Sequence, residues 1–263
     1  MKPQISEFSY GYALTDELIH WHGTNLTAAP IFPSLYQEGQ VGGGYDLMLQ
    51  RPGLPLFLQF KLADCMVLRS AKEVKDHIFQ VPYYRMHLRP TRHSSQHEML
   101  LSLENRGNEV YYSAPAFHTN NDLNNAYFSH QILNRSLWLR PSQIGPIPDD
   151  RPHYVAFQIP GVPHFRSEPK PLDTKGDFIE FTKRVEDVFR KSSDVALQRE
   201  KLRDLAETLQ GIAGKQGDIS LDTRRISERE LAKRHPIDQI AFYAHVVMDC
   251  QLFIVKEKTV GQR

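Results

Sequence analysis

The sequence predicts a mixed α/β fold, of the α+β type, with a helical C-terminal extension. Apolar residues between positions 8 and 21 recur near helical spacing. Two alternating runs, at residues 45–49 and 56–62, flank a turn signal at 51–53, which is typical of a hairpin. From residue 174 onward the chain is charged, nearly free of proline and again periodic like a helix. We therefore expect a sheet-bearing region at 1–165 and a helical region at 172–263.

The N-terminal part of the chain is predicted to form a helix followed by a long loop. The helix over residues 8–21 has Ser6 as its expected cap, although Gly11 weakens it. A loop rich in Thr, Pro and Gly follows, and it ends in three consecutive glycines at 42–44, which allow close approach of the backbone to other groups. The predicted hairpin of residues 45–62 comes directly after this loop.

The remaining elements follow from periodicity and turn signals. Residues 81–88 fit either a strand or a loop. Prolines between 141 and 171 indicate surface loops or a linker. The pattern leaves open whether the helical region after them is a separate domain or packs on the first. We expect helices at 71–79, 96–104, 122–131, 197–212 and 237–255, and strands at 110–114, 136–139 and 153–159.

Composition limits the classes of function. Lys plus Arg number 32 against 31 for Asp plus Glu, so only a local patch could attract a polyanion. Two distant cysteines give neither a disulfide framework nor a metal knuckle. No apolar run has the length of a membrane span, and the first residues lack the pattern of a secretory signal. We expect a cytoplasmic protein without a membrane partner.

The candidate site is on the predicted hairpin. Side chains alternate along a strand, so Gln59 and Lys61 share one face, and Asp46 on the preceding strand can lie beside them. A carboxylate from Asp46, the amide oxygen of Gln59 and the carbonyl of Phe60 could bind Mg²⁺, while Lys61 orients a water molecule or stabilises developing charge. This combination suits hydrolysis of a phosphodiester.

These residues carry a family resemblance. Gly44-Tyr45-Asp46, followed after the turn by residues 57–61 with Gln59 and Lys61, resembles the core of the PD-(D/E)xK nuclease superfamily, in its QxK variant. The resemblance implies a restriction-endonuclease-like central sheet flanked by helices. It also implies that Glu7 or Glu17, on the first helix, contributes an acid, and that the helix at 96–104 with the strand at 110–114 completes the core.

The function implied by this resemblance is that of a Mg²⁺-dependent or Mn²⁺-dependent endonuclease acting on DNA, with RNA as a possible substrate, in bacterial anti-phage defence. Gln59 replaces the usual second acid and removes one negative charge from the site. The alternative is therefore a catalytically inactive scaffold that binds nucleic acid or a partner protein through its helical end. A homodimer is a further expectation.

A basic, tyrosine-rich run provides the candidate nucleic-acid surface, by contact with the backbone and by stacking on bases. A solvated charged face explains the run equally well. Asp46 taken singly also fits a turn residue, and Lys61 fits a charged strand edge. The residues expected to bind nucleic acid are Tyr83, Tyr84, Arg85, Arg89 and Arg92.

Overall fold

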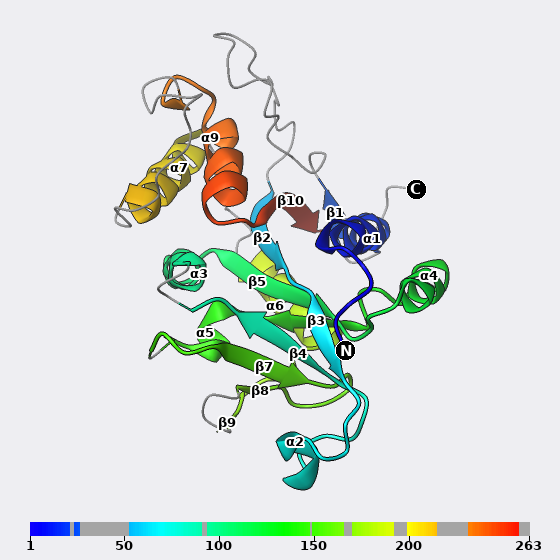
Figure 1. The fold of residues 1–263 in the computed structure, drawn as a ribbon. Helices are drawn as coiled ribbons and strands as arrows, with labels where there is room; N and C mark the ends of the chain where they lie inside the picture. The colour runs from blue at the N-terminus through cyan, green and yellow to red at the C-terminus, as the bar shows by residue number, and fades with distance from the viewer. Residues whose placement is uncertain are drawn as a thin grey trace.

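The fold is that of a computed structural model, which describes residues 1–21, 24–26, 53–90, 94–147, 149–165, 170–191, 199–214 and 231–257. It has the mixed α/β architecture predicted from the sequence, with helices around two sheets (Figure 1). Within these ranges, no helix combines the length and apolar character that crossing a membrane requires.

The first sheet is mixed. Its central strand β2 (Leu54–Phe60) runs parallel to β5 and antiparallel to β10. The outer strands β1 and β6 are antiparallel to their neighbours. The strand order is β1 (Thr24–Leu26), β10 (Gln251–Glu257), β2, β5 (Glu109–Pro115) and β6 (Ser136–Leu139).

The second sheet is antiparallel throughout and begins where β2 ends. Only Lys61 and Leu62 separate β2 from its first strand, so the chain passes from one sheet into the other at Lys61. The strand order is β3 (Ala63–Met66), β4 (Tyr83–Leu88), β7 (His153–Phe157), β8 (His164–Phe165) and β9 (Lys170–Pro171).

Helices cover both faces of the first sheet; in Figure 1 α1 and α4 lie to one side of it and α3, α7 and α9 to the other. One face packs against α1, α4 and α6, and the other against α3, α7 and α9. The short helix α2 lies on the second sheet. The helix bounds are α1 (Glu7–His20), α2 (Lys72–Lys75), α3 (Gln96–Asn105), α4 (Asn120–Phe128), α5 (Pro141–Ile144), α6 (Phe178–Lys191), α7 (Arg199–Gly214), α9 (Pro236–Phe242) and the π-helix η2 (Tyr243–Val247).

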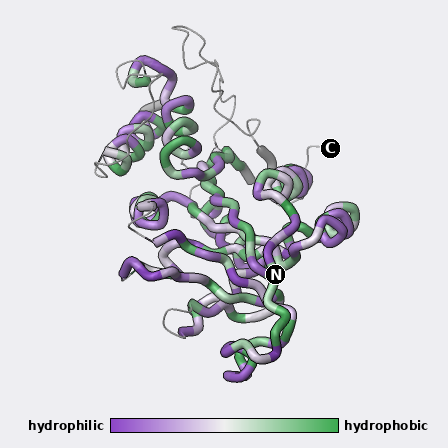
Figure 2. The backbone as a smooth tube through the Cα atoms, in the orientation of Figure 1, coloured by the Kyte–Doolittle hydropathy of each residue, from purple (hydrophilic) through white to green (hydrophobic). Residues whose placement is uncertain are grey.

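Alternation along β2 explains the two cores. Leu56 and Leu58 join the cluster under α1, whereas Phe57 joins the cluster that also contains residues of α3, α7 and the second sheet. Figure 2 shows hydrophobic and hydrophilic segments alternating around the turns of α7 and α9, as in amphipathic helices. β2 is therefore buried on both faces, and any polar side chain on it must find a partner inside the protein.

Most predicted elements are present within two or three residues of their expected ends, including α1 with its Ser6 cap. The helix predicted over 237–255 is wrong in its second half. It ends with η2 at Val247, and the chain turns at Asp249 into strand β10. The C-terminal region is therefore helical only in part, because its last described segment fills the place between β1 and β2.

Only the second strand of the predicted hairpin lies among the described residues, where it is present as β2. Residues 45–49 lie outside the described residues, but both edges of β2 are occupied from Leu56 to Leu58, by β10 and by β5. β10 takes the antiparallel position that the turn at 51–53 suggested for the preceding strand.

Gly11 has a structural reason to be in α1. A Cβ atom at this position would lie 2.7 Å from Cδ2 of Phe60, whose ring packs against the helix backbone. We expect Gly11→Ala to destabilise the protein by about 1 kcal/mol, because overpacking outweighs the gain in helix propensity. Thermal unfolding measures this change.

Gly211 is the matched control for that substitution. It lies inside α7, and among the described residues a Cβ there would meet no atom from outside its own stretch of helix within 4 Å. Gly211→Ala should therefore stabilise the protein by about 1 kcal/mol. If both substitutions change the stability in the same direction, the contact with Phe60 is not the reason for glycine at position 11.

Candidate active site

The polar pair at the end of β2, Gln59 and Lys61, faces α3. Gln59 and Lys61 continue the alternation of Phe57 and so point to the same face of the sheet as that residue. Both are buried: Gln59 is 1% exposed and Lys61 is 8% exposed. The prediction that these two side chains share one face is confirmed, because a single residue of α3 hydrogen-bonds to both.

That residue is Gln96, at the first position of α3, which the sequence did not single out. Its Oε1 accepts a hydrogen bond from Lys61 Nζ at 2.8 Å, and its Nε2 donates to Gln59 Oε1 at 2.8 Å. The same Nε2 lies 3.0 Å from Met248 O and 3.2 Å from Asp249 Oδ2. Gln96 thus joins β2, α3 and the turn before β10. We call Glu7, Gln59, Lys61, Gln96 and Asp249 the Lys61 cluster.

Glu7, in the first turn of α1, acts electrostatically on Lys61. The pKa of Glu7 is raised, first by loss of hydration in its surroundings and then by the negative charge of Asp249, while Lys61 and Arg89 oppose the change. The pKa of Lys61 is lowered, first by burial and also by the positive charge of Arg89, against the attraction of Glu7 and Asp249. Two carboxylates that solvent can reach thus act on the buried ammonium of Lys61.

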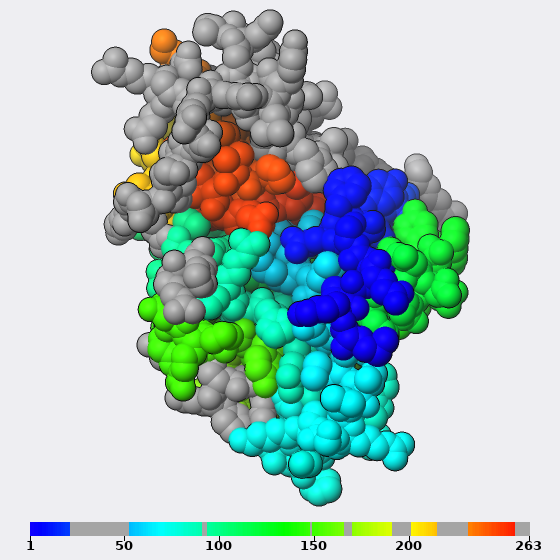
Figure 3. Space-filling view, viewed as in Figure 1, coloured from blue at the N-terminus to red at the C-terminus, as the bar shows by residue number. Residues whose placement is uncertain are grey.

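Asp249 reaches the cluster because of a turn in the backbone. It has φ of 52°, a left-handed conformation that Asp adopts more readily than most residues, and it is the second residue after η2. In the space-filling view the N-terminal segment with α1 (dark blue) lies beside the C-terminal segment (orange-red) and β2 (cyan) (Figure 3). Both ends of the described chain thus contribute an acid to the same place.

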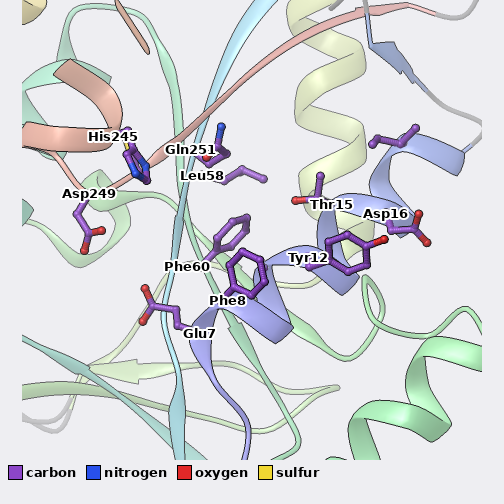
Figure 4. A pocket seen from close by; sticks show the side chains of 13 residues that line it. Glu7, Phe8, Tyr12, Thr15, Asp16, Leu58, Phe60, His245, Asp249 and Gln251 are labelled. Atoms are coloured by element: carbon purple, nitrogen blue, oxygen red, sulfur yellow. The ribbon is translucent and has the colours of Figure 1, made fainter. Parts of the chain in front are cut away.

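A largely apolar pocket of about 550 Å³ adjoins the cluster, between α1 and the turn before β10. Glu7 and Asp249 lie on the same side of it, away from Thr15 and Asp16 (Figure 4). Phe8 is 77% exposed here, so the pocket opens beside an aromatic ring.

The predicted nucleic-acid surface is corrected in part. Tyr83 is fully buried and Tyr84 is 8% exposed, so neither can stack on a base. Arg85 is paired with buried Glu73 at 2.7 Å, since alternation on β4 turns it toward α2. Arg89, at the end of β4, is exposed and acts electrostatically on Lys61 and Glu7. Arg92 lies outside the described residues.

Glu17 and Asp46 are the two other acids that the sequence predicts for the site. Glu17 is three helical turns beyond Glu7, roughly 15 Å along α1, and its carboxylate accepts a hydrogen bond from the backbone N–H of Ile132 at 2.8 Å. Glu17 therefore anchors the segment between α4 and β6 and is not part of the Lys61 cluster. Asp46, the predicted principal metal ligand, lies outside the described residues.

The fit of a divalent metal ion depends on the oxygen atoms present. Within the described ranges, no group of three or more His, Cys, Asp or Glu side chains is arranged to hold a metal ion. Mg²⁺, however, commonly takes only one or two carboxylates from a protein and completes its shell with water and substrate phosphate. Glu7 and Asp249 bring two carboxylates to one pocket, so the donor chemistry fits such an ion.

Gln59 and Phe60 fit the role of ligand less well. Gln59 Oε1 already accepts from Gln96, and the carbonyl of Phe60 accepts a hydrogen bond from Gln59 Nε2 at 2.9 Å. Each oxygen keeps a second lone pair, but neither carries charge.

No protein-family model, curated protein sequence or solved structure matches the chain.

Proposed function

We propose that the protein is a metal-dependent nuclease that hydrolyses phosphodiester bonds in DNA, with a restriction-endonuclease-like core of the PD-(D/E)xK class. The observation that carries the proposal is the burial of Lys61 at the end of the central strand, held by Gln96 and attracted electrostatically by the carboxylate of Glu7. A buried ammonium is unfavourable for folding alone, and its retention beside acids and amides is a feature of functional sites.

The roles follow from the contacts. Among the described residues, the side-chain oxygen of Gln96 accepts a hydrogen bond from the ammonium of Lys61. An ammonium has three N–H donors. The other donors could bind a phosphate oxygen or the attacking water. Glu7 would hold a divalent ion such as Mg²⁺ or Mn²⁺, together with Asp46 as the sequence predicts. Such an ion polarises the phosphate and lowers the pKa of a bound water molecule. Exposed Arg89 would contact the phosphate backbone.

The setting we propose is bacterial anti-phage defence, as the sequence resemblance implies, in a cytoplasmic protein that forms a homodimer. One observation favours the second candidate, an inactive scaffold that binds nucleic acid or a partner protein. Gln59, at the position of the second acid, is neutral and already hydrogen-bonded within the protein.

The test is incubation of the purified protein with labelled duplex DNA, single-stranded DNA and RNA, with Mg²⁺ or Mn²⁺ and with EDTA. We expect cleavage of DNA that depends on the metal and is lost in the Lys61→Met variant. Cleavage of RNA and not of DNA would show that the substrate is RNA. Binding of nucleic acid without cleavage under any metal would favour the scaffold.

A further inference from the structure

The motif proposed on β2 lacks one negative charge. On β2, Gln59 stands where the proposed motif has an acid, and both ends of its amide are hydrogen-bonded inside the protein. A site that binds Mg²⁺ through carboxylates would therefore need another acid close to the end of β2.

Asp249 is in that place. Its Oδ2 and Gln59 Oε1 both lie within hydrogen-bond distance of one atom, Gln96 Nε2, at 3.2 and 2.8 Å. The pairing of β10 with β2 sets this proximity. Gln251, the first residue of β10, is the partner of Leu58, so the turn that holds Asp249 two residues earlier lies near the end of β2.

The surroundings match a cation site with substrate access. Glu7 and Asp249 line the same pocket, and the negative charge of Asp249 acts on Glu7. Lys61 attracts both carboxylates, but its ammonium is fixed on Gln96 at 2.8 Å. Asp249 is exposed, unlike Gln59, so an ion could reach it from solvent.

We infer that Asp249 replaces the carboxylate missing at Gln59 and, with Glu7, binds the divalent metal ion. This inference rests on the proposed nuclease function. It places one ligand at the start of β10, in the C-terminal region, so the site is complete only when β10 pairs with β2.

The experiment measures binding of Mn²⁺ to the purified full chain without nucleic acid, by electron paramagnetic resonance of the free ion. We expect the affinity to fall at least about tenfold in Asp249→Asn and in Glu7→Gln. Exposed Asp173, in the turn before α6, provides the control: Asp173→Asn should bind like the wild type. Circular dichroism and the thermal midpoint show whether each variant is folded.

A rescue variant sharpens the test. Adding Gln59→Glu to Asp249→Asn returns a carboxylate to β2 beside Gln96 and should recover much of the lost affinity. Wild-type affinity in Asp249→Asn, or no Mn²⁺ binding by the wild type, would overturn the inference.

The inference and the proposed function can fail separately. Asp249-dependent Mn²⁺ binding by a protein that cleaves no nucleic acid would reject the nuclease and keep the metal site. Metal-dependent cleavage that Asp249→Asn leaves unchanged, with unchanged Mn²⁺ binding, would keep the nuclease and reject the role of Asp249.

Discussion

Lys61→Met is expected to reduce metal-dependent DNA cleavage by about 10³-fold, within the range for loss of a positioned proton-transfer or charge-stabilising group. Methionine keeps an unbranched apolar side chain in the space of the lysine stem, so packing at the end of β2 should persist. Single-turnover cleavage with saturating Mg²⁺ measures the effect.

The stability of this variant should change little. Removing a buried ammonium ends the free-energy cost of its burial, whereas Gln96 Oε1 loses its donor, and these effects oppose each other. The lowered pKa of Lys61 means that protonated Lys61 opposes folding below its ordinary pKa. Wild-type stability relative to Lys61→Met should therefore rise as the pH increases through the folded-state pKa toward the ordinary value.

The matched control is Lys175→Met, at an exposed lysine. It should retain wild-type cleavage. A Lys61→Met protein that is folded and cleaves DNA at the wild-type rate would contradict the proposed role of Lys61. Lys61→Arg separates two roles, because arginine keeps a positive charge but does not release a proton in this pH range. Partial activity would indicate that charge is the main contribution.

Glu73→Gln is expected to destabilise the protein by roughly 3 kcal/mol at neutral pH, because it removes the charge that pairs with a largely buried arginine. The Glu73 side chain is fully buried and accepts hydrogen bonds from Arg85 at 2.7 Å, Tyr83 at 2.9 Å and Tyr154 at 3.1 Å. The guanidinium also lies 4.6 Å from the ring centre of Tyr154. This network fixes α2 on the second sheet.

The effect should depend on pH. Burial alone would raise the pKa of Glu73, but hydrogen bonds from its own backbone, Arg85 and Tyr83 lower it overall. The stabilisation is therefore complete above the ordinary glutamate pKa and is lost as pH falls through the lower folded value. Urea unfolding at several pH values should show wild type and variant converging in acid.

Exposed Glu207 on α7 provides the control. Glu207→Gln should change the free energy of unfolding by less than about 0.5 kcal/mol. A Glu73→Gln deficit that stays constant down to acidic pH would show that the charge of Glu73 is not the source of the stabilisation.

The basic run of residues 83–92 shows why residue type alone misplaces a surface. Tyrosine and arginine in close sequence suit a nucleic-acid surface, but they suit a buried ion pair equally well. The choice depended on alternation along β4, which points Tyr83 and Arg85 toward Glu73 of α2. Glu73 is ten residues from Tyr83 and twelve from Arg85 in the chain. It lies on α2, and the sequence pattern does not predict how that helix packs.

Local sequence patterns located most of the helices and strands and predicted one feature of the site. Helical spacing and turn residues located α1, α3, α6 and α7, and the two-residue period of a strand put Gln59 and Lys61 on one face. These features depend on neighbours along the chain, so periodicity reports them.

The surroundings of that face depend on contacts between elements that are distant in the chain. Residues 251–257 form a strand because the place between β1 and β2 supplies hydrogen bonds on both edges, although an apolar run of that length also suits a helix. That pairing brings Asp249 to Gln96, 153 residues apart. Contacts at such separations follow from the packing of whole elements, which no local pattern specifies.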